Sequence, residues 1–179
     1  TSVFASAGLF SVVAGIAAAQ ALNASGFDPK GSLEIATLLE GHPDNVAPAI
    51  MGGLVSSFSD GRHTHSLRFE IAAGLAFVAI APPYEVRTAD ARKVMPQSVP
   101  TETAVWQIGH CVAAVHALTT GDAGLLAVSC QDRLHEPYRS QLIADYEPLR
   151  RTALAAGAAA YLISGSGSTM LAVCDGRKA

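Results

Sequence analysis

Four side chains that can bind a metal ion or a small polar molecule fall within six positions of the stretch LLEGHPDNVAP. They are Glu40, His42, Asp44 and Asn45, and apolar runs flank them on both sides. In the last turn of a helix, Glu40 would face the negative end of the helix dipole, which costs a few tenths to about 1 kcal/mol. A nearby cation would reverse that cost, so the stretch is a candidate site for a cation or a substrate.

Plainer interpretations of the same stretch stay open. Glu40 could be a solvated surface carboxylate, and His42, held extended before Pro43, could be a turn residue. Asp44 or Asn45 is typical of a helix N-cap, which does not exclude a function. A transition-metal site of Glu40, His42 and Asp44 is only weakly indicated, because such ligands usually project from one regular element.

Two arginines and a glycine-rich loop could hold anions elsewhere in the chain. Arg92 lies one helical turn after Thr88, and Arg139 lies in HEPYRSQL. A guanidinium group suits bidentate capture of a carboxylate or phosphate, although either arginine could equally form a surface salt bridge. The stretch SGSGST, residues 164–169, offers backbone N–H groups to an anion. It is neither a P-loop nor a dinucleotide fingerprint, because no Gly-Lys-Ser/Thr follows and the next element is a strand.

Composition narrows the classes of function. The 179-residue chain is 50% apolar and 15% charged, with a formal net charge of −3. This balance gives no reason to expect nucleic acid or a membrane surface as a partner. The run VVAGIAAAQAL is too short to span a bilayer, and no basic segment precedes it as in a signal peptide. Three widely spaced cysteines, Cys111, Cys130 and Cys174, are expected to be buried thiols in a reducing compartment.

The helix before the junction has clear signals at both ends. Asp28 is a typical N-cap and Pro29 suits the first turn, whereas Gly41 is expected to end the helix. The apolar residues of this helix that are expected to share its buried face are Ile35, Leu38 and Leu39.

The remaining elements give an α+β order. Helices are expected at residues 10–24, 45–51, 88–94, 101–119, 122–130 and 145–157. The expected strands are a hairpin with a two-residue turn at Asp60-Gly61, a buried strand at 74–82, and a strand–loop–strand at 159–175. Helices and strands do not alternate regularly, which argues against a βαβ wheel. The best domain boundary falls near 69–83.

Four motifs, taken in order, resemble one family. EGHPDNVAPAIMGGLV, TADARKVMP, DRLHEPYRSQLI and YLISGSGSTMLAV are similar to homoserine kinases of the GHMP small-molecule kinase superfamily. The resemblance covers nearly the whole chain, as about the last three fifths of such an enzyme, so an N-terminal part is expected to be missing. HPDNVAP together with EPYR points to homoserine kinase, whereas the glycine-serine loop is common to the superfamily.

The resemblance implies a fold and an activity. The fold is a two-domain α+β structure: residues 1–70 would be the rest of an ATP-binding domain like ribosomal protein S5 domain 2, and 71–179 a ferredoxin-like C-terminal domain. The activity is transfer of the γ-phosphoryl group of ATP, with Mg²⁺, to the side-chain hydroxyl of L-homoserine, giving O-phospho-L-homoserine for threonine biosynthesis. Such enzymes are cytoplasmic, need no dedicated catalytic base and are often dimeric, so a homodimer is expected.

The resemblance also assigns residues. Glu40 and Ser11 match the groups that support catalysis and hold Mg²⁺. The positions that match homoserine-binding residues are His42, Asn45, Arg92 and Arg139, with the arginines taking the substrate carboxylate. The positions that match ATP-binding residues are Gly8, Leu9 and Ser11, with Gly165, Ser166, Gly167 and Thr169 in the glycine-serine loop.

The ATP loop departs from the superfamily pattern. That pattern is Gly-Leu-Gly-Ser-Ser, but AGLFSVVAG has Phe10 where a glycine is expected. A bulky residue hinders backbone N–H groups from wrapping a triphosphate. Residues missing between Leu9 and Phe10 would explain the departure, because SVVAGIAAAQAL resumes the family's helix. Ser168 also stands where the family commonly has proline.

Other functions stay open at this point. The chain could be another GHMP small-molecule kinase, or a non-catalytic remnant with a broken ATP loop. It could also be a metal-dependent hydrolase centred on Glu40, His42 and Asp44. An amino-acid substrate would use both arginines, which favours homoserine kinase among these alternatives.

Overall fold

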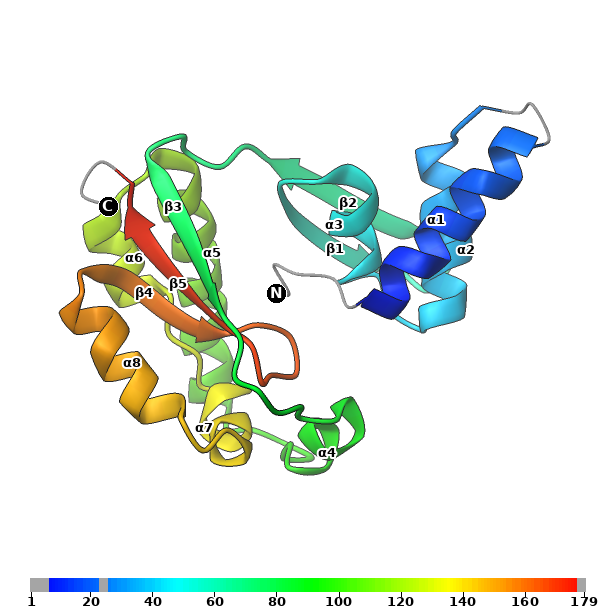
Figure 1. Cartoon of the computed structure of the whole chain (residues 1–179). Helices are drawn as coiled ribbons and strands as arrows, with labels where there is room; N and C mark the ends of the chain where they lie inside the picture. Colours follow the sequence, from blue (N-terminus) through cyan, green and yellow to red (C-terminus); the bar gives the residue numbers. More distant parts are fainter. Residues whose placement is uncertain (1–6, 23–25, 177–179) are drawn as a thin grey trace. The chain divides into compact units, whose positions relative to one another are not determined.

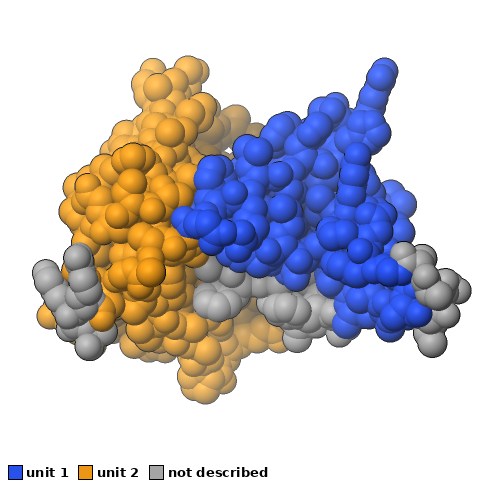
Figure 2. All heavy atoms as spheres, turned by 90° about the horizontal axis from the view of Figure 1, so that it is seen from above, with its two compact units in different colours: residues 1–70 blue, residues 71–179 orange. Residues whose placement is uncertain are grey.

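The computed structural model describes the backbone of residues 7–22 and 26–176, and the side chains of residues 13–21 and 26–176. Contacts divide the chain into two compact units, residues 1–70 and 71–179, which Figure 2 shows in different colours. The assignment of these units as an ATP-binding and a C-terminal domain stays a prediction.

Unit 1 places the HPDN junction between two helices. Its elements are α1 (Ala7–Leu22), α2 (Pro29–Glu40), α3 (Val46–Met51), β1 (Leu54–Ser59) and β2 (Thr64–Phe69). The expected ends of α2 are confirmed: the Asp28 side chain accepts a hydrogen bond from Lys30 N at 3.1 Å, and Gly41 has φ +87°. Asn45 occupies the N-cap position of α3, but its side chain makes no capping hydrogen bond, so that expected role is wrong.

The buried face of α2 differs from the expected one. Leu33 and Ala36 pack with Val46, Ala47 and Val55 into the core of unit 1. The residues expected to be buried, Ile35, Leu38 and Leu39, are 49%, 84% and 67% exposed. Helix α2 packs against α1 and α3, and these contacts determine which of its faces is buried. The face predicted from apolar periodicity alone is therefore wrong.

The hairpin turn is longer than expected. Strands β1 and β2 are antiparallel, and Ser59 pairs with Thr64, so four residues connect them. The Asp60 carboxylate accepts hydrogen bonds from the backbone N–H groups of Arg62 and His63, both at 2.8 Å, and lies 2.9 Å from His65 Nε2. The hydrogen bond with His65, followed by these two backbone bonds, lowers the pKa of Asp60. The side chain of Asp60 thus closes a wider turn than the two-residue type.

Unit 2 is built on a three-stranded antiparallel sheet (Figure 1). Its elements are β3 (Leu75–Ile80), α4 (Thr88–Lys93), α5 (Thr101–Thr120), α6 (Ala123–Ser129), α7 (Glu136–Arg139), the 3-10 helix η1 (Ser140–Leu142), α8 (Tyr146–Ala155), β4 (Ala158–Ile163) and β5 (Met170–Asp175). The strand order is β3-β5-β4. Strand β3 is therefore an edge strand with Val78 half exposed, and the expectation that it is buried is wrong.

Helices cover both faces of this sheet (Figure 1). On one face, α8 packs beside Tyr161 and Met170; on the other, Leu126 of α6 and Ala117 of α5 pack against Val173. Strand β5 is buried on both sides, which fixes the loop between β4 and β5 at one end of the sheet. In the described part of the chain, no helix is long and apolar enough to cross a membrane.

The cysteines are only partly buried. Cys111 is exposed on α5, which contradicts the expectation of a buried thiol, while Cys130 and Cys174 are half-buried. Burial raises the pKa of Cys130 to about 11.

Candidate functional site

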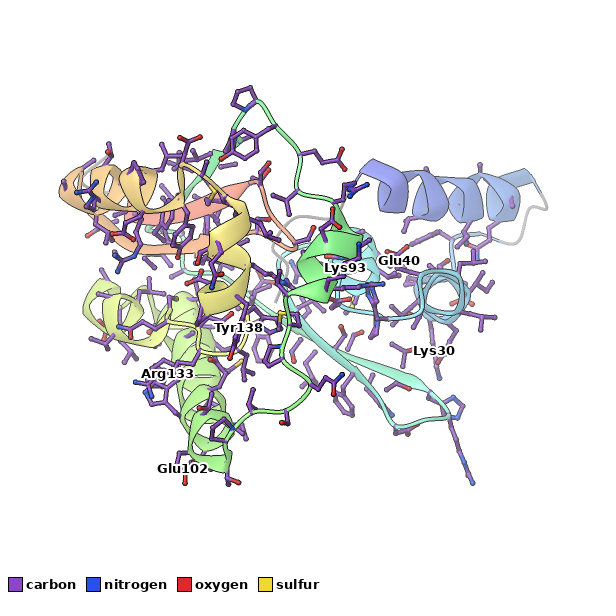
Figure 3. All side chains as sticks on the ribbon, turned by 90° about the horizontal axis from the view of Figure 1, so that it is seen from below. Lys30, Glu40, Lys93, Glu102, Arg133 and Tyr138 are labelled. Carbon is purple, nitrogen blue, oxygen red and sulfur yellow. The ribbon has the colours of Figure 1, made fainter. Side chains whose placement is uncertain are left out.

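In unit 1, the candidate functional residues lie at the junction between α2 and α3. Glu40 is the last residue of α2 and is exposed to solvent (Figure 3). His42 is half-buried, and its Nδ1 lies against Oδ1 of Asp44. The side-chain oxygen of Asn45 is buried and has no hydrogen-bond partner among the described residues. A buried acceptor without a donor costs about 1–3 kcal/mol, so a ligand donor would be favoured beside Asn45.

The acidic groups do not form a transition-metal centre. Among the described side chains, no three His, Cys, Asp or Glu residues lie close enough together to hold a metal ion. This gives no support to a metal-dependent hydrolase centred on Glu40, His42 and Asp44. A single exposed carboxylate does fit Mg²⁺, which usually keeps several water ligands and binds one or two carboxylates plus substrate phosphates.

In unit 2, the candidate functional residues lie around the glycine-serine loop at the end of β4. Ser164 N donates to Thr169 O at 2.9 Å, and Gly167 N donates to Ser164 O at 3.1 Å. Gly167 has φ +89°, and a Cβ there would lie 2.9 Å from Cδ1 of Ile143, so the loop requires glycine at this position. Arg139 Nη1 donates to the carbonyl oxygen of Gly165 at 2.8 Å.

Helix α4 reaches the same loop. Thr88 Oγ1 lies 3.4 Å from Ser166 Oγ, and Ser168 Oγ donates to the backbone oxygen of Tyr84, just ahead of α4. Arg92 follows Thr88 by one turn on α4. The structure therefore brings the start of α4, the end of α7 and the loop together at one end of the sheet.

Gly8 and Leu9 lie in the first turn of α1, where the sequence predicts a loop, and Ser11 follows in the same helix, as expected for residues 10–24. The helix runs without a break past Leu9 and Phe10, the place where missing residues were inferred. The side chains of these residues lie outside the described part of the structure. Their proposed contacts with ATP and Mg²⁺ stay predictions.

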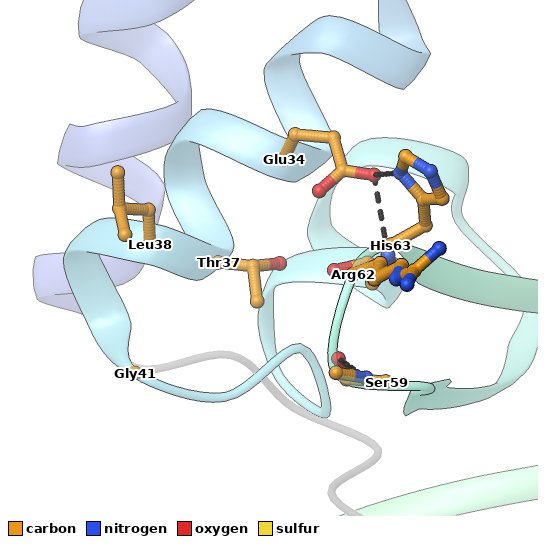
Figure 4. Close-up of a pocket in the computed structure, with 9 residues that line it drawn as sticks. Glu34, Thr37, Leu38, Gly41, Ser59, Arg62 and His63 are labelled. Atoms are coloured by element: carbon orange, nitrogen blue, oxygen red, sulfur yellow. Dashed lines mark hydrogen bonds and ion pairs between the residues drawn. The ribbon is translucent and has the colours of Figure 1, made fainter.

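An open pocket of about 260 Å³ lies between α2 and the hairpin, and Gly41, which follows Glu40, is one of the residues that line it (Figure 4). Glu34 accepts a hydrogen bond there from Thr64 N at 3.2 Å and lies 3.9 Å from Nδ1 of His63. Of the predicted site residues, neither Glu40 nor His42 lines this pocket.

Known proteins are similar to this chain in both sequence and fold. Residues 114–179 match the family model described as GHMP kinases C terminal. Curated homoserine kinases of Moorella thermoacetica and Clostridium kluyveri are 40% and 38% identical to the chain over 167 and 164 residues. These matches cover 93% and 92% of this chain, and 56% and 55% of the relatives, so the chain spans about half of their length.

Solved structures agree with the sequence matches. A homoserine kinase from Cytophaga hutchinsonii superposes with a TM-score of 0.83 at 33% identity, over 93% of this chain and 56% of that one. A putative homoserine kinase from Listeria monocytogenes gives a TM-score of 0.75 at 26% identity, over 94% and 56%. The chain has the α+β fold of the GHMP kinases. The fold class expected from the sequence is confirmed, while the residue assignments stay predictions.

One structurally important residue could not be recognised from the sequence alone. Glu136, in the HEPYR motif, accepts hydrogen bonds from Ile163 N at 2.9 Å and from the Tyr146 hydroxyl at 3.1 Å. These bonds join α7, which ends in Arg139, to the end of β4. Burial raises the pKa of Glu136, and burial together with this carboxylate raises the pKa of Tyr146. The residues around Glu136 in the sequence do not distinguish it from a glutamate exposed to solvent.

The raised pKa of Glu136 predicts a pH dependence of stability. The folded chain keeps the Glu136 proton at pH values where the unfolded chain has lost it. Its contribution to stability is therefore fully present below the ordinary pKa of 4.5 and is lost as the pH rises through the folded pKa. Glu136→Gln, which stays neutral, should become steadily more stable relative to wild type across that window.

Urea unfolding between about pH 4 and pH 7 measures this difference. Glu147→Gln, on the exposed surface of α8, is the matched control and should follow the wild-type curve. Parallel curves for Glu136→Gln and wild type would contradict the assigned ionisation.

Proposed function

We propose that the full-length protein is a homoserine kinase, which transfers the γ-phosphoryl group of ATP to the side-chain hydroxyl of L-homoserine. The observation that carries the proposal is similarity to homoserine kinases along nearly the whole chain, at up to 40% identity. The contact between Arg139 and the loop adds support, because a guanidinium group suited to bind a carboxylate lies beside a loop that resembles the superfamily's glycine-serine motif.

The substrate end of the proposed site uses charged hydrogen bonds. Arg139 and Arg92 would take the carboxylate of homoserine, and His42 and Asn45 would contact its polar groups. An arginine pair suits a carboxylate because each planar guanidinium can donate two parallel N–H bonds. The hydrogen bond to Gly165 restrains the Arg139 guanidinium before substrate arrives, which lowers the entropy lost on binding.

The phosphate end uses Glu40, with Ser11, to hold Mg²⁺, which would neutralise phosphate charge. Glu40 stands where the dipole of α2 disfavours a lone carboxylate, so a bound cation removes that cost. Phosphoryl transfer depends mainly on positioning and charge stabilisation, so the proposal requires no activated nucleophile on the chain.

A coupled assay of ADP release tests the proposed activity. The full-length protein, with MgATP, should release ADP when L-homoserine is added, and the amino-acid product should carry the phosphate on its side-chain oxygen. Release of ADP with another small alcohol, and none with homoserine, would point to a different GHMP kinase. No release with any alcohol tried would favour a non-catalytic protein.

Arg139→Ala should raise the KM for homoserine by about 10- to 100-fold, since a charge-assisted hydrogen bond contributes about 1.5–3 kcal/mol. The KM for ATP should change little. Arg151→Ala, an exposed arginine on α8, is the matched control and should leave both values unchanged. Equal increases in the two KM values would show that Arg139 does not select the amino acid.

Glu40→Gln should lower kcat/KM by about 100-fold or more, because it removes a charge that would position the metal and its phosphate ligands. The Mg²⁺ concentration giving half-maximal rate should also rise. Glu34→Gln on the same helix keeps an oxygen that can accept from Thr64 N and serves as the control. An unchanged Mg²⁺ dependence in Glu40→Gln would exclude the metal role.

A further inference from the structure

Helix α4 is too short to hold its own position. It consists of Thr88–Lys93, and Arg87 at its N-cap position makes no side-chain capping hydrogen bond. Isolated helices of this length are unstable in water, so contacts with the rest of unit 2 must place it. Val86 and Ala91 supply two of these contacts, since both are buried in the core of the unit. The exposed Arg92 follows Ala91, so its position depends on the same anchors.

Tyr84, ahead of α4, is held through its backbone and through its side chain. Its backbone oxygen accepts a hydrogen bond from Ser168 Oγ. Its hydroxyl donates to Oδ2 of Asp145 at 3.1 Å and accepts from Asp145 N at 3.3 Å. Ser168 belongs to the glycine-serine loop, and Asp145 occupies the N-cap position of α8. The chain that leads into α4 is therefore tied to two other elements of unit 2 (Figure 1).

The Ser168 hydroxyl is buried and comes from a constrained part of the loop. Ser168 is 8% exposed, and a buried hydroxyl is costly unless it forms a hydrogen bond. The residue before it, Gly167, has no room for a Cβ, and Ser164 N donates to Thr169 O across the loop. A proline at position 168, as is common in the family, has no hydroxyl to donate. The bond to the chain ahead of α4 is therefore a feature of this sequence.

Both arginines proposed to bind the substrate carboxylate are tied to this loop. Arg139 donates directly to the carbonyl oxygen of Gly165. Arg92 is tied to the loop through Tyr84 and Ser168. We propose that Ser168 is a positioning residue, whose hydroxyl holds the Arg92 guanidinium in the place and orientation that carboxylate binding needs. Two arginines bind one carboxylate well only when their N–H groups converge on it, so this inference rests on the proposed function.

Hydrogen exchange in the full-length protein tests the tether without using activity. The backbone N–H groups of Asp90 and Ala91 donate to Arg87 O, so their exchange reports on α4. In Ser168→Ala they should exchange about three- to tenfold faster than in wild type, as expected for the loss of one hydrogen bond. Thr152→Ala removes a hydroxyl-to-carbonyl bond within α8 and should leave both rates unchanged. Equal rates in Ser168→Ala and wild type would contradict the tether.

A double-mutant cycle tests what the tether does for the substrate. Ser168→Ala should raise the KM for homoserine about three- to tenfold and leave the KM for ATP nearly unchanged. If this effect passes through Arg92, Ser168→Ala should add almost nothing in a protein that already carries Arg92→Ala. Leu126→Ala, in the core on the other face of the sheet, is the control for lost stability. It should lower the melting temperature without raising the KM for homoserine.

The outcomes separate this inference from the proposed function. Additive effects of Ser168→Ala and Arg92→Ala, or equal increases in the KM values for homoserine and ATP, would contradict the positioning role of Ser168. A wild-type protein that does not phosphorylate homoserine would reject the proposed function instead. The exchange rates of Asp90 and Ala91 would then still decide whether Ser168 holds the chain ahead of α4.

Discussion

The proposed substrate end of unit 2 depends on the hydrogen bond from Arg139 to the carbonyl oxygen of Gly165. It joins the end of α7 to a loop whose shape is already fixed by its own backbone bonds and by the lack of a side chain at Gly167. Glu136 ties the beginning of α7 to β4 in the same region. An arginine that must meet a carboxylate in one orientation needs this support, because a loosely held guanidinium loses more entropy on binding.

Unit 1, in contrast, holds two polar groups in positions that destabilise the folded chain. Glu40 lies at the negative end of a helix dipole, and the buried oxygen of Asn45 has no partner among the described residues. Each costs on the order of 1 kcal/mol, a noticeable share of the stability of an ordinary domain. Proteins usually break such local rules at functional sites, where a ligand restores what the folded chain lacks. Mg²⁺ and a polar substrate would do so here.

The sequence predicted features that depend on neighbouring backbone groups. The cap of α2 by Asp28 was predictable because its carboxylate bonds to an N–H two residues away. The predictions were wrong where contacts between residues far apart in the chain determine which side chains are buried. Packing against α3 chose the buried face of α2, and the strand order made β3 an edge.

For the candidate functional residues, too, the sequence predicted some features, and only the structure revealed others. Motif resemblance selected Arg139 and the loop, and the structure links them through a bond that no spacing rule would reveal. Glu136 was missed because its role comes from partners on β4 and α8, which are 10 to 27 residues away in the chain. The capping role expected of Asn45 at the α2–α3 junction is wrong, since its side chain makes no capping hydrogen bond.

The most direct measurement compares L-homoserine with 3-amino-1-propanol, the same amino alcohol without its carboxylate, as phosphoryl acceptors for the full-length protein. If the arginines select the carboxylate, kcat/KM should be about 1,000-fold or more higher for homoserine, because several charge-assisted hydrogen bonds are lost with the analogue. Similar kcat/KM values for the two alcohols would contradict the central claim that this GHMP kinase fold recognises an amino acid through Arg92 and Arg139.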